Sequence, residues 1–386
     1  MTSNATRRIS VGSYFDGERH HCDGPYAVVV ESDHIVAIQP SRGLSPAEVS
    51  FLMPALADAH VHVFLDGGEI DPDARKRHLL KQRESLLATA LANADASWQT
   101  GISLLRDAGD PHGINDALRE QLVSASRGLR LRSSGVALHR PGQYGSFLGM
   151  AVANDRDLPR ITAEIAQQAD HIKVLLTGAI DFRTGGVKGP PQFDLAAARA
   201  IVGAARTCGK TAFVHCNGNE GLQIAIAAHF DSIEHGYGMD EESLRRMAEE
   251  GIAWTPTLAP VAALRNLPAK FTGFSPETLA CVDQVLARHG EAIARAAQLG
   301  VALLCGSDAG GQGVPHGSGL IDEMILLASA GAPMETVLRG ATSLPRARWG
   351  EPSSNLVAGN RFDAIALTQS PFESPEALRN AARLES

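Results

Sequence analysis

Short apolar runs of strand character alternate with longer segments of helical periodicity along most of this 386-residue chain. We expect eight strands, over residues 51–62, 102–107, 129–138, 171–176, 211–215, 232–235, 252–258 and 302–308. Amphipathic helices are expected between them, over residues 74–98, 115–126, 159–168, 194–208, 220–228, 240–250 and 276–299. Because parallel strands need a crossover connection, usually a helix, this alternation predicts an α/β fold with a parallel sheet.

The predicted strand–helix units cover residues 52–308. This span is close to the roughly 250 residues typical of a TIM barrel, so the expected fold class is α/β with a (β/α)8 TIM barrel as its main part. A doubly wound open sheet is the structural alternative. It would spread the polar residues that end these strands along one edge of the sheet, instead of arranging them around a ring.

Two histidines, His60 and His62, stand at the end of the first predicted strand. In a β-strand, residues i and i+2 project from the same face, so both imidazoles can bind one metal ion. A helix would separate them. The strand reaches this pair through an apolar run that begins near Pro54, where a missing backbone donor does little harm.

Four further residues of metal-binding type lie on later predicted strands: Lys173, His215, His235 and Asp308. In a TIM barrel the active site is built at the C-terminal ends of the strands, where these side chains would meet the histidine pair. A lone histidine at a strand end is commonly a hydrogen-bonded structural residue. The ordered set of six favours a metal site.

The two ends of the chain fall outside this alternation. Residues 9–49 contain short β signals with polar breaks, and residues 356–368 look the same. We expect both ends to pair into one small β-sandwich beside the barrel. The predicted domains are then 1–52 and 350–386 for the sandwich, and 53–349 for the metal-dependent barrel.

Composition and charge exclude several classes of partner. The formal net charge is -8, and the basic and acidic residues are mixed without a long basic run, which argues against nucleic acid and an anionic membrane surface. No apolar stretch reaches the roughly 18 residues of a membrane span, and no apolar signal-peptide region is found. Five dispersed cysteines without a CxxC pair fit reduced thiols. We expect a cytoplasmic protein with a small-molecule substrate, and a homo-oligomer is compatible with the sequence.

The ordered set His60-x-His62, Lys173, His215, His235 and Asp308 resembles the amidohydrolase superfamily of metal-dependent hydrolases, over nearly the whole chain. Shorter pieces resemble the branch that contains imidazolonepropionase and prolidase-like dipeptidases: residues 101–107, 171–174, 232–236, 255–258 and 306–310. The resemblance implies two divalent metal ions. His60 and His62 would hold one ion, and His215 and His235 the other. Lys173, as N6-carboxylysine, would bridge them, and Asp308 would bind the first ion and act as general base.

The chemistry of these residue types agrees with the implied roles. Zinc, the expected metal, favours imidazole and carboxylate ligands and lowers the pKa of its bound water to about 7, which gives a hydroxide nucleophile at neutral pH. Asp308 can take a proton from that water and pass it to a leaving amine. A lysine ammonium has no acceptor and cannot bind a cation. We therefore hypothesise that Lys173 carries a carbamate and that the site is binuclear.

Other residues near these strands have less specific signals. Asp58, Asp107 and Glu234 are expected to support the ligands or to form structural ion pairs. Cys216 alternates away from His215 and is expected in the core, which disfavours a cysteine nucleophile.

Candidate substrate contacts lie in the loops that follow the strands. His139 could polarise a substrate carbonyl, although an ordinary loop histidine is an equal interpretation. Arg183 and Lys188 could bind a substrate carboxylate, with solvated loop charges as the alternative. Tyr237 and His316 directly follow ligand-bearing strands, where position alone suggests contact.

Three functions stay open at this point. The leading hypothesis is hydrolysis of an amide bond in a small molecule such as a dipeptide or N-acyl amino acid. The second is an aminohydrolase, or a cyclic amidase, acting on a heterocycle. Deaminases of this superfamily usually carry an acid three residues after the fifth-strand histidine, where this chain has Gly218, with Glu220 two positions further. The third is a non-catalytic scaffold, which the intact ligand set opposes.

Overall fold

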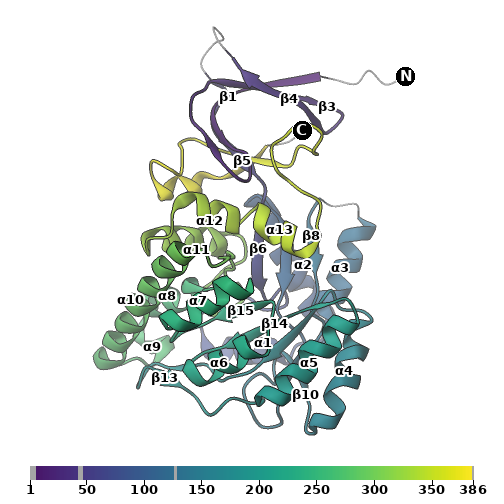
Figure 1. Ribbon diagram of the computed structural model, residues 1–386, viewed down its shortest axis with the longest axis vertical. Coiled ribbons are helices and arrows are strands. Elements are labelled where there is room, and N and C mark those ends of the chain that lie inside the picture. Colours follow the sequence, from purple (N-terminus) through teal and green to yellow (C-terminus); the bar gives the residue numbers. More distant parts are fainter. Residues whose placement is uncertain (1–5, 42–46, 126–127, 385–386) are drawn as a thin grey trace.

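The computed structural model describes residues 6–41, 47–125 and 128–384. Figure 1 shows a small sheet, built from both ends of the chain, above a larger part in which helices surround strands. The strands of the larger part are β6 (Leu56–Val61), β7 (Ile102–Asp107), β8 (Arg130–Arg132), β9 (Ala137–His139), β10 (Gly149–Ala151), β11 (His171–Leu175), β14 (Thr211–Cys216), β15 (Ser232–His235) and β16 (Ala253–Thr255). Every pairing among them is parallel, which confirms the predicted parallel α/β fold.

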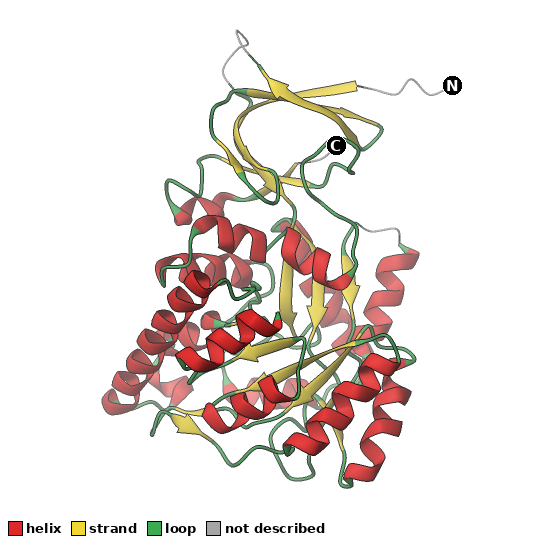
Figure 2. Ribbon diagram, in the orientation of Figure 1, coloured by secondary structure: helices red, strands yellow, loops and turns green. Residues whose placement is uncertain are grey.

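The helices lie outside these strands, as Figure 2 shows. They are α1 (Pro72–Leu79), α2 (Arg83–Gln99), α3 (Ile114–Ser124), α4 (Leu158–Ala166), α5 (Leu195–Thr207), α6 (Asn219–Ala227), α7 (Glu241–Glu250), α8 (Leu258–Asn266), α9 (Ala269–Thr272), α10 (Pro276–Leu299), α11 (Ser318–Ser329), α12 (Met334–Gly340) and α13 (Ser343–Trp349). A short hairpin of β12 (Ile180–Asp181) and β13 (Gly186–Val187) follows β11. Strands such as β6, β7 and β11 are buried along their whole length, which explains their unbroken apolar character.

The parallel strands form two sheets, ordered β6-β7-β8 and β10-β9-β11-β14-β15-β16. Backbone hydrogen bonds outside the regular strands link them. On one side Asp170 N donates to Ser133 O at 2.7 Å, beyond the end of β8. On the other side residues 302–309 bridge β16 to β6, for example from Ala59 N to Cys305 O at 2.9 Å. This arrangement is consistent with a TIM-barrel-like domain, and the closed eight-stranded barrel stays a prediction.

Four predicted elements differ from the structure. The predicted strand 51–62 is divided at Ala55, between a strand of the terminal sheet and β6. Residues 302–308 are not a regular strand, because their pairing is reduced to isolated bridges at Leu303 and Ala309. The predicted strand 129–138 is split into β8 and β9. The predicted helix 74–98 is broken between α1 and α2, since His78 Nε2 donates to Phe64 O at 2.8 Å and holds α1 over the strand ends, whereas α2 packs against β7.

One sheet unites the two ends of the chain, in the order β18-β17-β5-β1-β3-β4, with β2 paired to β1. Its strands are β1 (Thr6–Phe15), β2 (His20–His21), β3 (Tyr26–Glu31), β4 (His34–Pro40), β5 (Val49–Pro54), β17 (Ala364–Leu367) and β18 (Ala382–Leu384). The predicted pairing of both ends is seen in the antiparallel contact of β17 with β5. A two-layer sandwich stays a prediction. The chain passes from this sheet into the larger part at Ala55, between β5 and β6.

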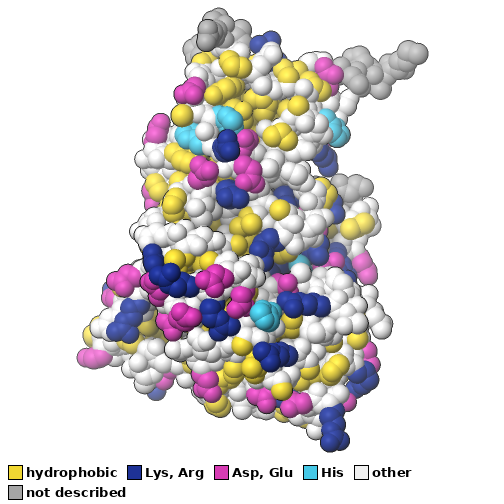
Figure 3. Space-filling model, in the orientation of Figure 1, with side chains coloured by type: hydrophobic (Ala, Val, Ile, Leu, Met, Phe, Trp, Pro, Cys, Tyr) yellow, Lys and Arg dark blue, Asp and Glu magenta, His cyan; other side chains and the backbone are white. Residues whose placement is uncertain are grey.

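Basic and acidic side chains are interspersed over the face shown in Figure 3. No helix in the described ranges is both long enough and apolar enough to cross a membrane.

The contact between the sheet and the larger part predicts a stability effect. Ile365 on β17 is fully buried, and its Cγ2 lies against Gly101, just before β7. Ile365→Ala should lower the free energy of unfolding by about 2–5 kcal/mol, since it leaves a cavity. Val36→Ala, on a side chain that is 44% exposed, is the control and should change it by less than about 0.5 kcal/mol. Equal denaturation midpoints for the two variants would contradict this account.

Candidate metal centre and substrate cavity

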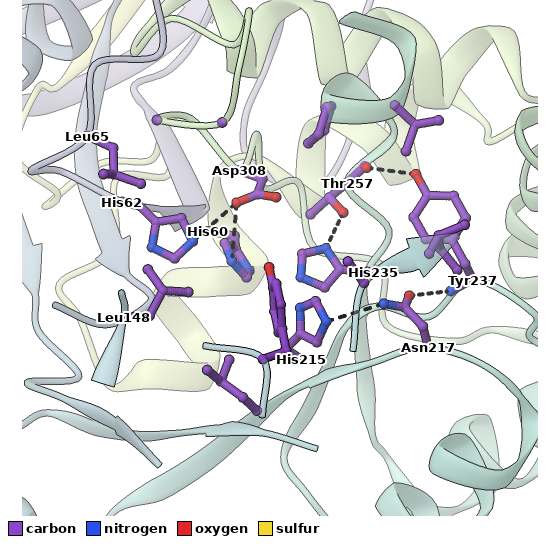
Figure 4. Close-up of a pocket in the computed structure, with 18 of the residues that line it drawn as sticks. His60, His62, Leu65, Leu148, His215, Asn217, His235, Tyr237, Thr257 and Asp308 are labelled. Carbon is purple, nitrogen blue, oxygen red and sulfur yellow. Dashed lines mark hydrogen bonds and ion pairs between the residues drawn. The ribbon is translucent and has the colours of Figure 1, made fainter. Parts of the chain in front are cut away.

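The six residues predicted as metal ligands line one cavity of about 280 Å³. They come from elements far apart in the sequence: His60 from β6 and His62 just after it, Lys173 from β11, His215 from β14, His235 from β15, and Asp308 from the segment after residue 302. Figure 4 shows the side chains of His60, His62, His215, His235 and Asp308 facing a common space. The structure therefore brings these residues together, and their roles as ligands stay a prediction.

His60, His235 and Asp308 form the tightest group. One side-chain ligand atom of each lies within 4.8 Å of the others. His62 adjoins this group, with its Nε2 at 3.3 Å from Oδ1 of Asp308, and Nε2 of His60 lies 3.6 Å from the same oxygen. The rings of His215 and His235 are 4.4 Å apart between centroids. In this structure Nε2 of His215 also lies 3.3 Å from Gly178 O.

The charge states of these groups suit a cation. Burial and the nearby charge of Lys173 lower the pKa of His60 to about 4 and that of His215 to about 3. Burial and the neighbouring histidines lower the pKa of His235 well below its usual value. Burial raises the pKa of Asp308, but the hydrogen bond from His62 and nearby positive charges outweigh this effect and hold the pKa below its ordinary value. At neutral pH His60, His215 and His235 therefore offer lone pairs, and Asp308 carries a negative charge.

Lys173 provides the clearest sign that the side chains of the cavity need a further group. Its Nζ is buried and has no hydrogen-bond partner among the residues that the structure describes. Burial, together with the charge of Arg106, lowers the pKa of Lys173 to about 8, although Glu234 opposes this shift. A buried amine without a partner is costly. The donor set and this unsatisfied amine fit a site for divalent metal.

A buried carboxylate holds His60 in one orientation. Glu234 Oε2 lies 2.6 Å from Nδ1 of His60, and its Oε1 accepts from Arg106 at 2.9 Å and from Ser232 at 2.7 Å. Burial raises the pKa of Glu234, but the charge of Arg106 and the bond to His60 outweigh it, so the carboxyl is ionised. An ionised carboxylate accepts a hydrogen bond from the Nδ1–H group, which keeps the ring proton on Nδ1 and leaves Nε2 of His60 as the nitrogen with a lone pair.

Two other acids support the backbone around the site. Asp58 accepts from Ser307 Oγ at 2.5 Å and Ser307 N at 2.9 Å, so it ties β6 to the segment that carries Asp308. Asp107 accepts from Val63 N at 2.9 Å, just after His62. Both were predicted to support the ligands, and both contact the backbone next to them.

Three residues that line the cavity have strained backbones. His235, Thr257 and Asp308 have positive φ values of 67°, 51° and 55°, in the left-handed region that non-glycine residues rarely adopt. Nδ1 of His235 lies 2.7 Å from Thr257 Oγ1, so one strained residue orients another. Strain of this kind persists where the surrounding structure holds a functional geometry.

The predicted substrate contacts are placed unequally. Tyr237 lines the cavity and donates from its hydroxyl to Thr257 O at 3.1 Å. His139 is buried outside the cavity lining, with its Nδ1 at 2.8 Å from Arg140 O. Arg183 and Lys188, around the β12–β13 hairpin, are exposed and also lie outside the lining. His316 is buried near His62 but does not line the cavity.

Several cavity residues were not predicted from the sequence. Asn217 and Thr257 follow strands β14 and β16 by one or two residues, a position that could have marked them. Arg75 and Leu264 come from helices α1 and α8, whose amphipathic pattern gives no sign of which residues face the site.

Comparison with known proteins adds independent information. A family model described as the amidohydrolase family matches residues 51–379. An uncharacterized protein of Mycobacterium tuberculosis is 28% identical over 355 residues, which cover 90% of this chain and 87% of that protein. The ochratoxinase of Aspergillus niger is 26% identical over 392 residues, covering 90% and 78% of the two chains.

Solved structures show the same fold. A crystal structure of a Xaa-Pro dipeptidase with bound methionine superposes with a TM-score of 0.80 and 22% identity, covering 99% of this chain and 100% of that one. The crystal structure of the Aspergillus niger ochratoxinase gives a TM-score of 0.78 at 20% identity, covering 98% and 93%.

The bond between Glu234 and His60 predicts a loss of metal affinity in Glu234→Gln. The glutamine amide would donate to Nδ1, so the ring proton would move to Nε2, the nitrogen that faces Asp308. Zinc affinity at pH 7, measured by competition with a chromophoric chelator, should fall by about 10–100-fold.

The matched control is Glu323→Gln. Burial raises the pKa of Glu323 to about 8, so this carboxyl is already mostly neutral at pH 7, and it contacts Ala259 N instead of a candidate ligand. The zinc affinity of the Glu323→Gln variant should equal that of the unaltered protein. An unchanged affinity in Glu234→Gln would contradict the role given to this carboxylate.

Proposed function

This chain belongs to the amidohydrolase family, and on that premise we propose that it is a metal-dependent hydrolase that cleaves the amide bond of a dipeptide, an N-acyl amino acid or a similar small molecule. The family match confirms the resemblance found in the sequence. Family membership identifies a hydrolase that acts on C–N bonds, and the substrate class and the metal dependence are our proposal.

The observation that carries the proposal is the convergence of neutral histidines, one ionised aspartate and an unsatisfied buried lysine on one cavity. When bound there, a divalent cation supplies a Lewis acid for the substrate carbonyl and a nucleophile at neutral pH. In our proposal His60, His62, His215, His235 and Asp308 would hold two such ions, zinc being the expected one, and Lys173 would contribute oxygen ligands as a carbamate, formed by addition of CO₂ to its neutral amine with release of a proton.

Asp308 has the position and charge of a general base. It is held by Nε2 of His62 at 3.3 Å, and its pKa lies below the ordinary value. We propose that its carboxylate accepts the proton of the attacking water and delivers it to the leaving amine, as general acid–base catalysis requires. The cavity around Asp308 has apolar walls that include Leu148 and Val261.

The deaminase alternative has little support in the structure. Among the described residues, Asp308 is the only carboxylate that lines the cavity. Glu220, the acid nearest to the position that deaminases use, is exposed on α6 and lies outside the lining.

A substrate screen tests the proposed reaction. Purified, metal-replete protein should release amino acids from a mixed library of dipeptides, N-acyl amino acids and heterocyclic amines, when amino acid and ammonia are measured separately. Asp308→Asn should lower the turnover by about 10²–10⁴-fold, since it removes the base. Asp322→Asn, at a carboxylate on α11 that is 43% exposed, is the control and should keep full turnover. Release of ammonia alone would overturn the proposal and establish a deaminase.

A further inference from the structure

The cavity outside the candidate metal ligands is predominantly apolar. Its walls are formed by side chains from the loops after β6, β9 and β11 and from α8, among them Leu65, Phe147, Leu148, Ile180, Phe182 and Val261. An apolar wall of this extent favours a substrate with a bulky apolar group, because each buried CH₂ contributes roughly 0.8 kcal/mol. A substrate that was polar throughout would lose its hydration here without replacement.

One charged residue interrupts this apolar wall. Apart from the candidate ligands, Arg75 of α1 is the only charged side chain that lines the cavity in the described part of the chain. Its Nη2 donates to Gly310 O at 2.6 Å, and Gly310 lies two residues after Asp308. The guanidinium is therefore close to the proposed general base, and the two charges interact electrostatically.

The hydrogen bonds of Arg75 leave part of its guanidinium free for a ligand. Nη1 donates to the backbone oxygens of Asp66 at 2.6 Å and Glu69 at 3.0 Å, and Nη2 makes the bond to Gly310. A guanidinium has five N–H groups, so these three bonds leave the Nε hydrogen and one on Nη2. Neighbouring donors of this kind match the two oxygens of a carboxylate.

Arg75 also has no matching negative charge in direct contact. Among the ion pairs of the described residues, none joins Arg75 to a carboxylate within 4.0 Å, and the side chain is half-buried. Asp66, Glu69 and Asp308 attract the guanidinium electrostatically but lie beyond ion-pair distance. A ligand carboxylate would supply the direct ionic partner that this half-buried cation lacks among the described residues.

A hollow beside the cavity has a lining of the same sign of charge. This hollow, of about 450 Å³, shares Leu65, Arg75 and Phe147 with the cavity. Its lining also includes Lys76, Arg77 and Lys81, against only two acids. Basic side chains beside the cavity raise the local concentration of anions.

We propose that the substrate carries one carboxylate close to the scissile amide, bound by Arg75, and a bulky apolar group held by the opposite wall. This inference rests on the proposed function and narrows it to anionic amides with an aromatic or large aliphatic side chain. Arg75 is then the residue that determines specificity. The exposed Arg183 and Lys188, which the sequence indicated for this task, lie outside the lining.

A purely structural role for Arg75 makes a different prediction. Its three carbonyl contacts join the loop after β6 to the loop after Asp308, so it could act only as a brace. Removal of a brace would impair every substrate alike. Removal of a carboxylate-binding group would impair only substrates that carry the carboxylate.

The test uses an N-acyl-L-phenylalanine and its C-terminal carboxamide, two substrates that differ in one charge. For the unaltered, metal-replete protein, kcat/KM for the acid should exceed that for the carboxamide by at least roughly tenfold. In Arg75→Met this ratio should fall to near one through a higher KM for the acid, while kcat/KM for the carboxamide changes by less than about twofold. Arg83→Met, which removes the same charge at an exposed residue outside both hollows, should keep the original ratio.

Each other outcome has a separate meaning. Equal kcat/KM for both substrates in the unaltered protein, or an equal loss for both in Arg75→Met, would overturn the inference and leave the proposed function in place. If the protein turns over neither of these substrates nor any amide in the screen, both the inference and the proposed function are overturned. If Arg75→Met does not fold, as judged by its melting transition, Arg75→Lys replaces it. This variant keeps the charge without the paired donors and should give an intermediate ratio, whereas an unchanged ratio would overturn the inference.

Discussion

The buried carboxylate of Glu234 is the interaction on which the geometry of the site depends. It joins Arg106 of β7 to His60 of β6 from its own position on β15, and all three side chains are almost completely buried. Arg106 also donates to Ala59 O at 2.7 Å and lies over the ring of Phe213, so three strands are held together behind the cavity. A buried ion pair of this kind adds little net stability, but loss of one partner costs about 3–5 kcal/mol. Its main effect here is to set which nitrogen of His60 faces the cavity.

Different parts of the molecule have different roles around this buried core. The strand ends and the segment that carries Asp308 place the histidines, the lysine and the aspartate, and two of these residues, His235 and Asp308, have strained backbones with positive φ values. Each such residue stores on the order of 1–3 kcal/mol, which the surrounding packing must offset. The loops and the first helix supply the apolar wall and Arg75. The reaction type is thus a property of the strand ends, and the choice of substrate is a property of the segments that cover them.

The strand ends could be predicted from the sequence, because a buried parallel strand reads as an apolar run and its polar terminus stands out. His60, Lys173, His215, His235 and Asp308 were found in this way, and all of them line the cavity. The long helix α10 was predicted with the bounds that it has, because its apolar period, Ser275 at the N-cap and Gly300 at the end agree.

The differences between the predicted and the observed elements arise from tertiary contacts, which the periodicity of the sequence does not reveal. Helical periodicity continues across residues 80–82, and only the tertiary bond from His78 to Phe64 O shows why α1 turns away from α2. The segment 302–308 has the composition of a strand, but its neighbours leave it only isolated bridges. Arg75 could not be predicted as a cavity residue from the sequence. Its contact with Gly310 depends on the tertiary fold, which places the loop that carries Gly310 beside helix α1.

The central claim is that this cavity holds a binuclear metal site, and anomalous X-ray diffraction at the zinc edge, from crystals of zinc-loaded protein, tests it most directly. The account predicts two zinc peaks, one beside His60 and His62 and one beside His215 and His235, with density for a carbamate extending from Lys173 between them. A single peak beside an unmodified lysine would contradict the binuclear site. The absence of any zinc peak in the cavity would contradict the claim as a whole.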